Sequence, residues 1–173
     1  MIAERDLFHP LVRPLGWGDL DRVMEIELAA YPHPWTRGIF GDCLRVGYDC
    51  WGLQLGAQLV GYSIQSDAAG ESHLLNLCVA PEWQRRGCGQ VLLENAVRTA
   101  RAHGCESMYL EVRPSNPAGI ALYDRHGFTV IGRRPDYYSA SAVSEPSPSV
   151  EAGQGREDAL VMRLDLRWNR PRA

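Results

Sequence analysis

A short basic turn with two glycines is the segment of this 173-residue sequence whose residue types most clearly suggest chemistry. Residues 84–89 read Gln-Arg-Arg-Gly-Cys-Gly and stand between an apolar segment, 72–79, and an amphipathic segment, 90–103. The apolar segment predicts a strand and the amphipathic one a helix. Unpaired backbone N–H groups and the helix dipole attract anions to a helix start. The glycines let the backbone approach a ligand closely, and the arginines add positive charge, so the turn predicts a phosphate site.

Two familiar nucleotide motifs do not fit this turn. A dinucleotide fingerprint would need a third glycine where Leu92 stands. A P-loop would need Lys-Ser or Lys-Thr after the glycines, and neither pair follows them. The turn instead has the form Gln/Arg-x-x-Gly-x-Gly/Ala.

A second informative segment covers residues 110–128, Leu-Glu-Val-Arg-Pro-Ser-Asn-Pro-Ala-Gly-Ile-Ala-Leu-Tyr-Asp-Arg-His-Gly-Phe. It predicts a strand that ends in an Asn-containing loop, a short helix with Ala-x-x-Leu-Tyr, and a Gly-Phe step into another strand. Together with the turn it resembles the GNAT superfamily of N-acetyltransferases. Two further segments, Asp-Tyr-Tyr at 136–138 and Gly-Arg-Glu-Asp-Ala at 155–159, narrow the resemblance. With them, residues 10–166 are similar to the RimI group of that superfamily.

The resemblance implies a fold and a reaction. The implied fold is α/β, with a mixed, mostly antiparallel sheet flanked by helices and a splayed central strand pair that holds coenzyme A. The implied reaction moves the acetyl group of acetyl-CoA directly to the N-terminal amine, that of alanine, of a small-subunit ribosomal protein.

The resemblance also assigns two catalytic roles. Glu111, on the predicted strand 108–112, would be the general base that deprotonates the amine. Tyr123, on the predicted helix 118–125, would protonate the departing thiolate. The bland alternatives are a surface glutamate on a strand and a tyrosine that packs its ring with an exposed hydroxyl. A histidine base is a further alternative.

The same resemblance implies a coenzyme site, in which the strand 77–79 binds the pantetheine arm through its backbone. Asn116 would hydrogen-bond the coenzyme, cap the following helix, or do both. Cys88 would face the phosphates rather than the thioester, so it is not expected to be a nucleophile. The residues expected to bind the coenzyme are Leu77, Cys78, Val79, Arg85, Arg86, Gly87, Cys88, Gly89, Gln90 and Asn116.

The acceptor site is expected where the sequence departs from the RimI pattern. Residues 31–35, Tyr-Pro-His-Pro-Trp, contain an extra proline and histidine, and a Ser-, Pro-, Ala- and Gly-rich insert is predicted at 139–155. Early acidic residues would favour a basic peptide if they border the groove, or else belong to a solvated helix face. Expected groove residues are Trp35, Tyr137, Tyr138, Glu157 and Asp158. Trp35 could equally be packed in the core.

Length and composition predict one domain over residues 1–173, with a mobile insert at 139–155. The resemblance implies that this is an N-acetyltransferase domain. A net charge of −3 argues against an electrostatic nucleic-acid binder. No apolar run approaches 18 residues, and the first nine residues lack the apolar core of a signal peptide. Five cysteines without a Cys-x-x-Cys pair predict a reduced, cytoplasmic protein, and scattered histidines predict no metal site. A monomer is favoured.

Periodicity and turn residues give the remaining elements. Strands are expected at 11–15, 50–55, 58–66, 71–79, 108–112, 128–133 and 158–166, and helices at 19–30, 36–44, 90–103 and 118–125. Gly104 suits the end of the third helix. This order predicts a sheet that is antiparallel at first and has parallel crossovers later.

Two other functions stay open. The chain could acetylate a small amine or a lysine side chain, and the groove loops would decide this. A non-catalytic acyl-CoA-binding module is the third possibility, although the presence of both Glu111 and Tyr123 speaks against it.

Overall fold

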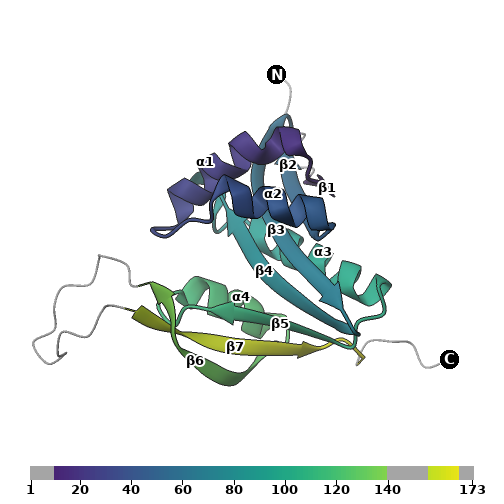
Figure 1. Ribbon diagram of the computed structural model, residues 1–173, viewed down its shortest axis with the longest axis vertical. Coiled ribbons are helices and arrows are strands. Elements are labelled where there is room, and N and C mark those ends of the chain that lie inside the picture. The colour runs from purple at the N-terminus through teal and green to yellow at the C-terminus, as the bar shows by residue number, and fades with distance from the viewer. Residues whose placement is uncertain (1–9, 140–155, 168–173) are drawn as a thin grey trace, which may run out of the picture. The chain divides into compact units, whose positions relative to one another are not determined.

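Figure 1 shows a computed structural model of the chain, which describes residues 10–139 and 156–167. The chain divides into two compact units. The first extends to Tyr109 and includes the chain from Asp165 onward, and the second covers Leu110–Leu164. Residues 140–155 of the predicted insert lie outside the described residues, and Ser139 is the last residue of a strand. No helix among the described residues is both long and apolar enough to cross a membrane.

The first unit is built on an antiparallel meander. Its strands, in spatial order, are β1 (Leu11–Pro14), β2 (Asp49–Leu55), β3 (Gln58–Ala68) and β4 (Glu71–Val79). The beginning of β5 (Ser107–Val112) lies beside β4, where the rings of His73 and Tyr109 stack 5.3 Å apart. Helix α3 (Cys88–Ala102) connects β4 to β5, and such a crossover makes the two strands parallel.

Helices cover both faces of this meander (Figure 1). Helices α1 (Leu20–Ala30) and α2 (Arg37–Val46) lie on one face and α3 lies on the other. On β3, Tyr62 and Ile64 pack under α1 and α2, whereas Val60 packs with Leu92 of α3. The pairing with β2 shifts register beside Val60, and this bulge turns its side chain to the other face of the sheet. Burial on both faces therefore fixes the strand register that leads into the basic turn.

The helix ends follow the predicted signals. The Thr36 hydroxyl accepts a hydrogen bond from the Ile39 N–H (3.4 Å) at the start of α2. The Asn116 side chain does the same for Gly119 (3.0 Å) at the start of α4 (Pro117–Arg125). Gly104, at φ +78°, ends the α3 turn in the left-handed region that glycine tolerates.

The second unit has a strand order that the sequence did not predict. Its strand order is β5, β7 (Arg156–Asp165), β6 (Thr129–Ser139), so β7 lies between β5 and β6. Strands β6 and β7 are antiparallel. Helix α3 joins the neighbouring strands β4 and β5, whereas α4 connects β5 to β6, which β7 separates. Sequence periodicity cannot show that a later strand inserts between two earlier ones.

Strand β6 is also longer than expected and continues beyond Arg133 to Ser139. Its pairing with β7 shifts register between Arg134 and Tyr138, and Asp136 there has φ +52°. Asp158 accepts a hydrogen bond from the Asp136 N–H (3.2 Å). A proline and a left-handed residue hide this part of the strand from a search for alternating polarity.

Candidate active site

The basic turn has the geometry that its sequence predicts for a phosphate site. Arg85 and Gly87 both have left-handed backbone, at φ +57° and +84°, and Gly87 is the residue before α3. Arg85 and Arg86 are exposed and make no ion pair within the described part of the chain. The Arg86 guanidinium lies 5.1 Å from the centre of the Trp83 ring. Two unpaired cations beside the first N–H groups of a 15-residue helix suit a pyrophosphate.

Cys88, the first residue of α3, faces the protein interior and is 6% exposed. Burial raises the pKa of its thiol, and the nearby Arg86 only partly opposes this. A thiol with a raised pKa is a poor nucleophile near neutral pH. This supports a structural role for its side chain, with its backbone N–H left at the helix start.

Two side chains of the protein donate hydrogen bonds to backbone carbonyls at the end of β4. The Tyr31 hydroxyl donates to the Leu77 carbonyl (3.0 Å), and the Gln84 side chain donates to the Val79 carbonyl (3.0 Å). Cys78 is buried, and burial, helped by the nearby Glu27, raises the pKa of its thiol to about 12. Cys78 and Cys105 are buried free thiols and fill the interior as small apolar side chains.

Glu111 lies on strand β5, as expected, and is half-buried. Its side chain is 16% exposed, between the buried Leu110 and Val112. The Arg134 guanidinium lies 3.3 Å from its carboxylate, and the same guanidinium is 5.6 Å from the centre of the Tyr137 ring. The sequence did not predict that Arg134 contacts Glu111. The two residues belong to different strands, so their spacing along the chain does not indicate the contact.

Tyr123 and Asn116 are positioned by α4. Tyr123 is buried, and its ring makes an edge contact with Phe128 at 5.8 Å. The ring is therefore packed against the protein. Only the hydroxyl group would take part in proton transfer. Asn116 uses its side-chain oxygen for the cap at Gly119, which leaves its NH₂ group as a donor for a ligand.

The two acidic groove candidates on β7 have internal partners. Glu157 accepts hydrogen bonds from the Ser115 N–H (2.8 Å), the Ser115 hydroxyl (2.9 Å) and Arg113 (3.3 Å). Partial burial acts to raise the pKa of Glu157, but these hydrogen bonds and the Arg113 charge outweigh it and hold the pKa below its usual value. Asp158 contacts Asp136 and lies 3.6 Å from Arg133. Glu157 thus fixes the loop that carries Asn116.

Tyr137 and Tyr138 follow the irregular part of β6. Tyr137 is 44% exposed, and Tyr138 pairs with Glu157 across the two strands. Trp35 is half-buried, and its ring is 5.4 Å from that of Phe40. It packs on the core without being enclosed by it.

Glu27 is the residue whose environment the sequence did not predict. It is 1% exposed. Its carboxylate accepts hydrogen bonds from the Trp35 N–H (2.8 Å), from Asn76 (3.4 Å) and from the Tyr62 hydroxyl. Glu27 therefore connects α1 to the segment 31–35 and to strands β3 and β4.

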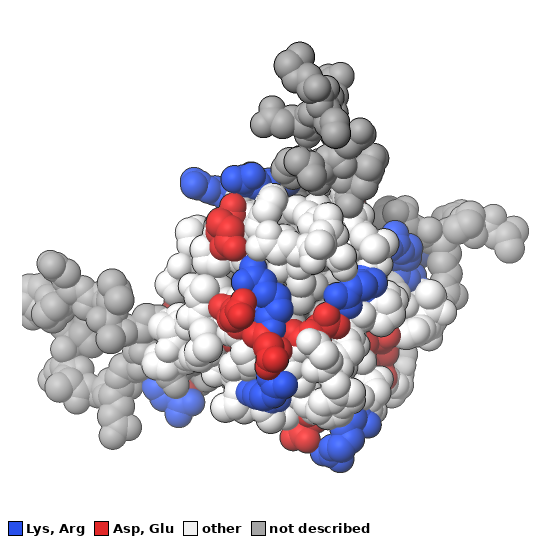
Figure 2. Space-filling model, turned by 90° about the horizontal axis from the view of Figure 1, so that it is seen from above, with Lys and Arg blue, Asp and Glu red and all other residues white. Residues whose placement is uncertain are grey.

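Other early acidic residues do lie on a solvated surface. Asp21 and Asp42 pair with Arg37 and Arg45, and Arg22 pairs with Glu25. Figure 2 shows acidic and basic side chains side by side on the visible face rather than one extended patch of a single sign. Glu4 and Asp6 lie outside the described residues.

The comparisons with known proteins agree with this arrangement. Residues 20–128 match the model of the acetyltransferase (GNAT) family. The chain is 32% identical over 148 residues to the ribosomal protein bS18-alanine N-acetyltransferase of Escherichia coli K12, which covers 86% of this chain and 92% of the relative.

Solved structures give the same result. The crystal structure of the Escherichia coli ribosomal-protein-S18-alanine N-acetyltransferase matches with a TM-score of 0.79 at 30% identity, over 91% of this chain and 94% of that one. A GNAT family acetyltransferase from Elizabethkingia anophelis with acetyl-CoA bound shares the fold, with a TM-score of 0.71 at 17% identity over 91% and 99% of the chains. The chain therefore belongs to the GNAT family and is an acetyl-CoA-dependent N-acetyltransferase.

Proposed function

We propose that this enzyme acetylates the α-amine of an N-terminal alanine. The substrate that we propose is a small-subunit ribosomal protein, the counterpart of bS18. The observation that carries the proposal is 32% identity over nearly the whole length of a relative with that activity. We also expect the enzyme to work in the cytoplasm as a monomer. Its five cysteines, all buried and free, suit a reducing compartment.

In this proposal the turn at 84–89 binds the pyrophosphate of acetyl-CoA. Arg85 and Arg86 supply unpaired charge, and the first N–H groups of α3 donate hydrogen bonds. The backbone at 77–79 and the Asn116 amide would orient the rest of the coenzyme. The bound coenzyme supplies an activated thioester, and the protein supplies orientation and proton transfer.

Glu111 is the proposed general base. An α-amine has a pKa of about 8, so much of it is protonated at neutral pH and cannot attack a carbonyl. A half-buried carboxylate can accept that proton directly or through a water molecule. Arg134, 3.3 Å away, supports this role by holding the carboxylate in one orientation.

Tyr123 is the proposed acid for the departing sulfur. Its packed ring limits the positions that the hydroxyl can take, as a proton donor requires. Trp35 and the segment 31–35 of the first unit, and separately Tyr137 and Tyr138 of the second unit, are proposed to contact the acceptor. Glu157 and Asp158 would act on the acceptor through the loop and strand that they hold, rather than by direct contact.

The proposal is tested by comparing kcat/KM for two short peptides that share one basic sequence. One has a free N-terminal alanine and no lysine, and the other has a blocked N-terminus and one lysine. We expect acetylation of the free alanine terminus alone. Activity on the lysine peptide alone would replace the proposal by lysine acetylation, and coenzyme binding without activity on either peptide would point to small amines.

Variants then test the assigned roles. Glu111→Gln should lower kcat by about 10²–10⁴-fold, the usual range for a general base, and Tyr123→Phe should also lower kcat. Tyr109→Phe is the matched control, because Tyr109 is on the same strand, is half-buried and contacts His73 and Glu71 instead. Wild-type rates in both catalytic variants would refute the assignment.

A further inference from the structure

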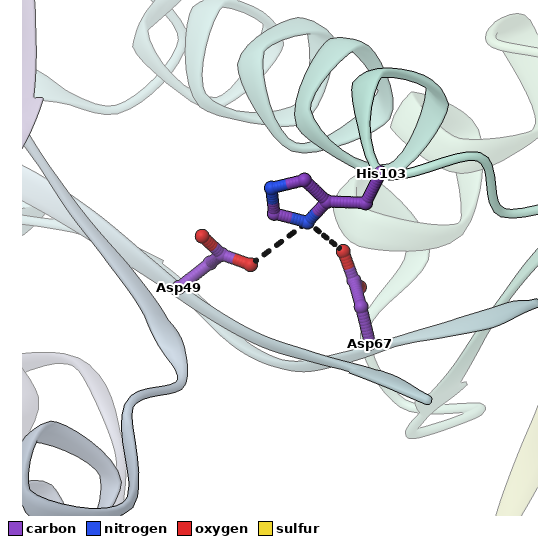
Figure 3. A group of neighbouring side chains, drawn as sticks. All are labelled: Asp49, Asp67 and His103. Carbon is purple, nitrogen blue, oxygen red and sulfur yellow. Dashed lines mark hydrogen bonds and ion pairs between the residues drawn. The ribbon is translucent and has the colours of Figure 1, made fainter. Parts of the chain in front are cut away.

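Three side chains that are distant in sequence meet at the end of α3, within the first unit. Figure 3 shows His103, the residue that follows α3, pointing toward Asp49 on β2 and Asp67 on β3. His103 Nδ1 lies 2.7 Å from Asp67 and 3.5 Å from Asp49. The three potential ligand atoms all lie within 4.8 Å of one another.

The pairing register of strands β2 and β3 brings the two carboxylates to the same part of the sheet. Asp49 lies opposite Gln65 in the β2–β3 pair, and Asp67 is two residues beyond Gln65. All three therefore share the sheet face that α3 covers, where Leu53 packs with α3. The turn at Gly104 ends α3 directly above them.

The charges of the cluster are not balanced by a single hydrogen bond. Two carboxylates face one imidazole, and the Asp67 and Asp49 side chains are only 11% and 25% exposed. The carboxylate oxygens of Asp49 and Asp67 and the imidazole nitrogen lie within 4.8 Å of one another, so the two carboxylates repel each other. A divalent cation would remove this repulsion.

A second observation lies beside the carboxylates. Gln65 is 0% exposed, and its NH₂ group approaches Asp67 at 3.3 Å. Its side-chain oxygen is buried and has no hydrogen-bond partner in the described part of the chain. Buried polar atoms are rarely left unpaired, so this oxygen suits a water molecule held by a metal.

We propose that Asp49, Asp67 and His103 form a binding site for a divalent transition-metal ion of the Zn²⁺ type. One imidazole nitrogen and two carboxylate oxygens are ligands that such ions accept, with water completing the shell. Bonds of about 2.0–2.2 Å would place the ligand atoms roughly 3–3.5 Å apart. The ligand atoms now lie 2.7 Å (His103 to Asp67) to at most 4.8 Å apart, so only small side-chain movements are needed. The sequence did not predict this site, because its ligands come from three separate elements.

The test uses untagged, chelator-stripped protein and Zn²⁺ and Co²⁺ as probes near neutral pH. We expect calorimetry to give one bound Zn²⁺ per chain, and Zn²⁺ to raise the thermal midpoint of unfolding. His103→Ala and Asp49→Asn should each weaken binding by at least about tenfold, because even indirect partners of a metal are worth that much. Co²⁺ should give a visible absorption band that both variants lose.

His73→Ala is the matched control. His73 is also exposed and lies 3.9 Å from a carboxylate, that of Glu71, but it has one acidic partner and not two. It should bind Zn²⁺ as the wild type does. No stoichiometric binding by the wild type, or equal binding by folded His103→Ala and Asp49→Asn variants, would overturn the proposal and leave a hydrogen-bonded His–Asp cluster.

Discussion

Replacing Glu27 by alanine should destabilise the protein strongly. The substitution removes a carboxylate that is 1% exposed and leaves the Trp35 N–H, the Tyr62 hydroxyl and Asn76 without their partner. A buried group that loses its hydrogen bond costs about 1–3 kcal/mol. Two strong bonds, to Trp35 and Tyr62, therefore predict a loss of about 2–6 kcal/mol in the free energy of unfolding, a large share of the usual 5–15 kcal/mol.

Two milder variants separate the contributions. Tyr62→Phe keeps the ring, which packs edge-on against Phe40 at 5.4 Å, and removes only the hydroxyl, for an expected loss of about 1.5–3 kcal/mol. Glu27→Gln keeps an oxygen that can accept from the Trp35 N–H and should cost less than alanine. Combining the two substitutions should give less than the sum of their separate losses, because both remove the same contact.

The assay is equilibrium unfolding in urea, followed by tryptophan fluorescence and circular dichroism. Glu25→Ala is the control on the same helix, since Glu25 is 64% exposed and its only ion pair within residues 10–139 and 156–167 is with Arg22. Its effect should stay within about 0.5 kcal/mol. A Glu27→Ala variant that unfolds within that same margin of the wild type would refute the argument that this buried carboxylate connects α1 to the sheet.

Three further predictions follow from the described contacts. Arg86→Ala should weaken coenzyme A binding about tenfold in calorimetry, through loss of a charge-assisted contact with phosphate, and Arg101→Ala at the other end of α3 should not; equal affinities would remove the phosphate role. The pKa of Glu157 is held below its usual 4.5, so its contribution to stability is fully present above pH 4.5 and is lost as the pH falls through the lower pKa of the folded state. Glu157→Gln should therefore lower the free energy of unfolding in urea at neutral pH, and by progressively less below pH 4.5. An equal loss at both pH values would contradict this. All five cysteines are buried, so a thiol reagent at pH 8 should label none rapidly in the native protein and five in urea, and rapid native labelling would contradict the packing.

Local signals in the sequence were sufficient for most of the fold. The cap at Thr36, the glycine at 104 and the proline at 117 mark helix ends because they act on the backbone within a few residues. The phosphate turn is likewise a contiguous segment. The resemblance of residues 10–166 to the GNAT family covers both units. Its family and fold were therefore predicted correctly.

Long-range features were missed for a physical reason. The insertion of β7 between β5 and β6 depends on strand pairing across the insert, which no local pattern encodes. Glu27 looks like an ordinary acidic residue on a helix, and only its partners on β3 and β4 account for its burial. Arg134 and the cluster around His103 depend in the same way on contacts between separate elements.

The central claim is tested most directly by one peptide that offers both kinds of amine, a free N-terminal alanine and an internal lysine. The peptide is incubated with the enzyme and acetyl-CoA, and fragment ions in a mass spectrum locate the acetyl group. The account predicts that acetylation occurs on the α-amine of alanine and is lost with Glu111→Gln. Acetyl groups on the lysine alone would contradict it.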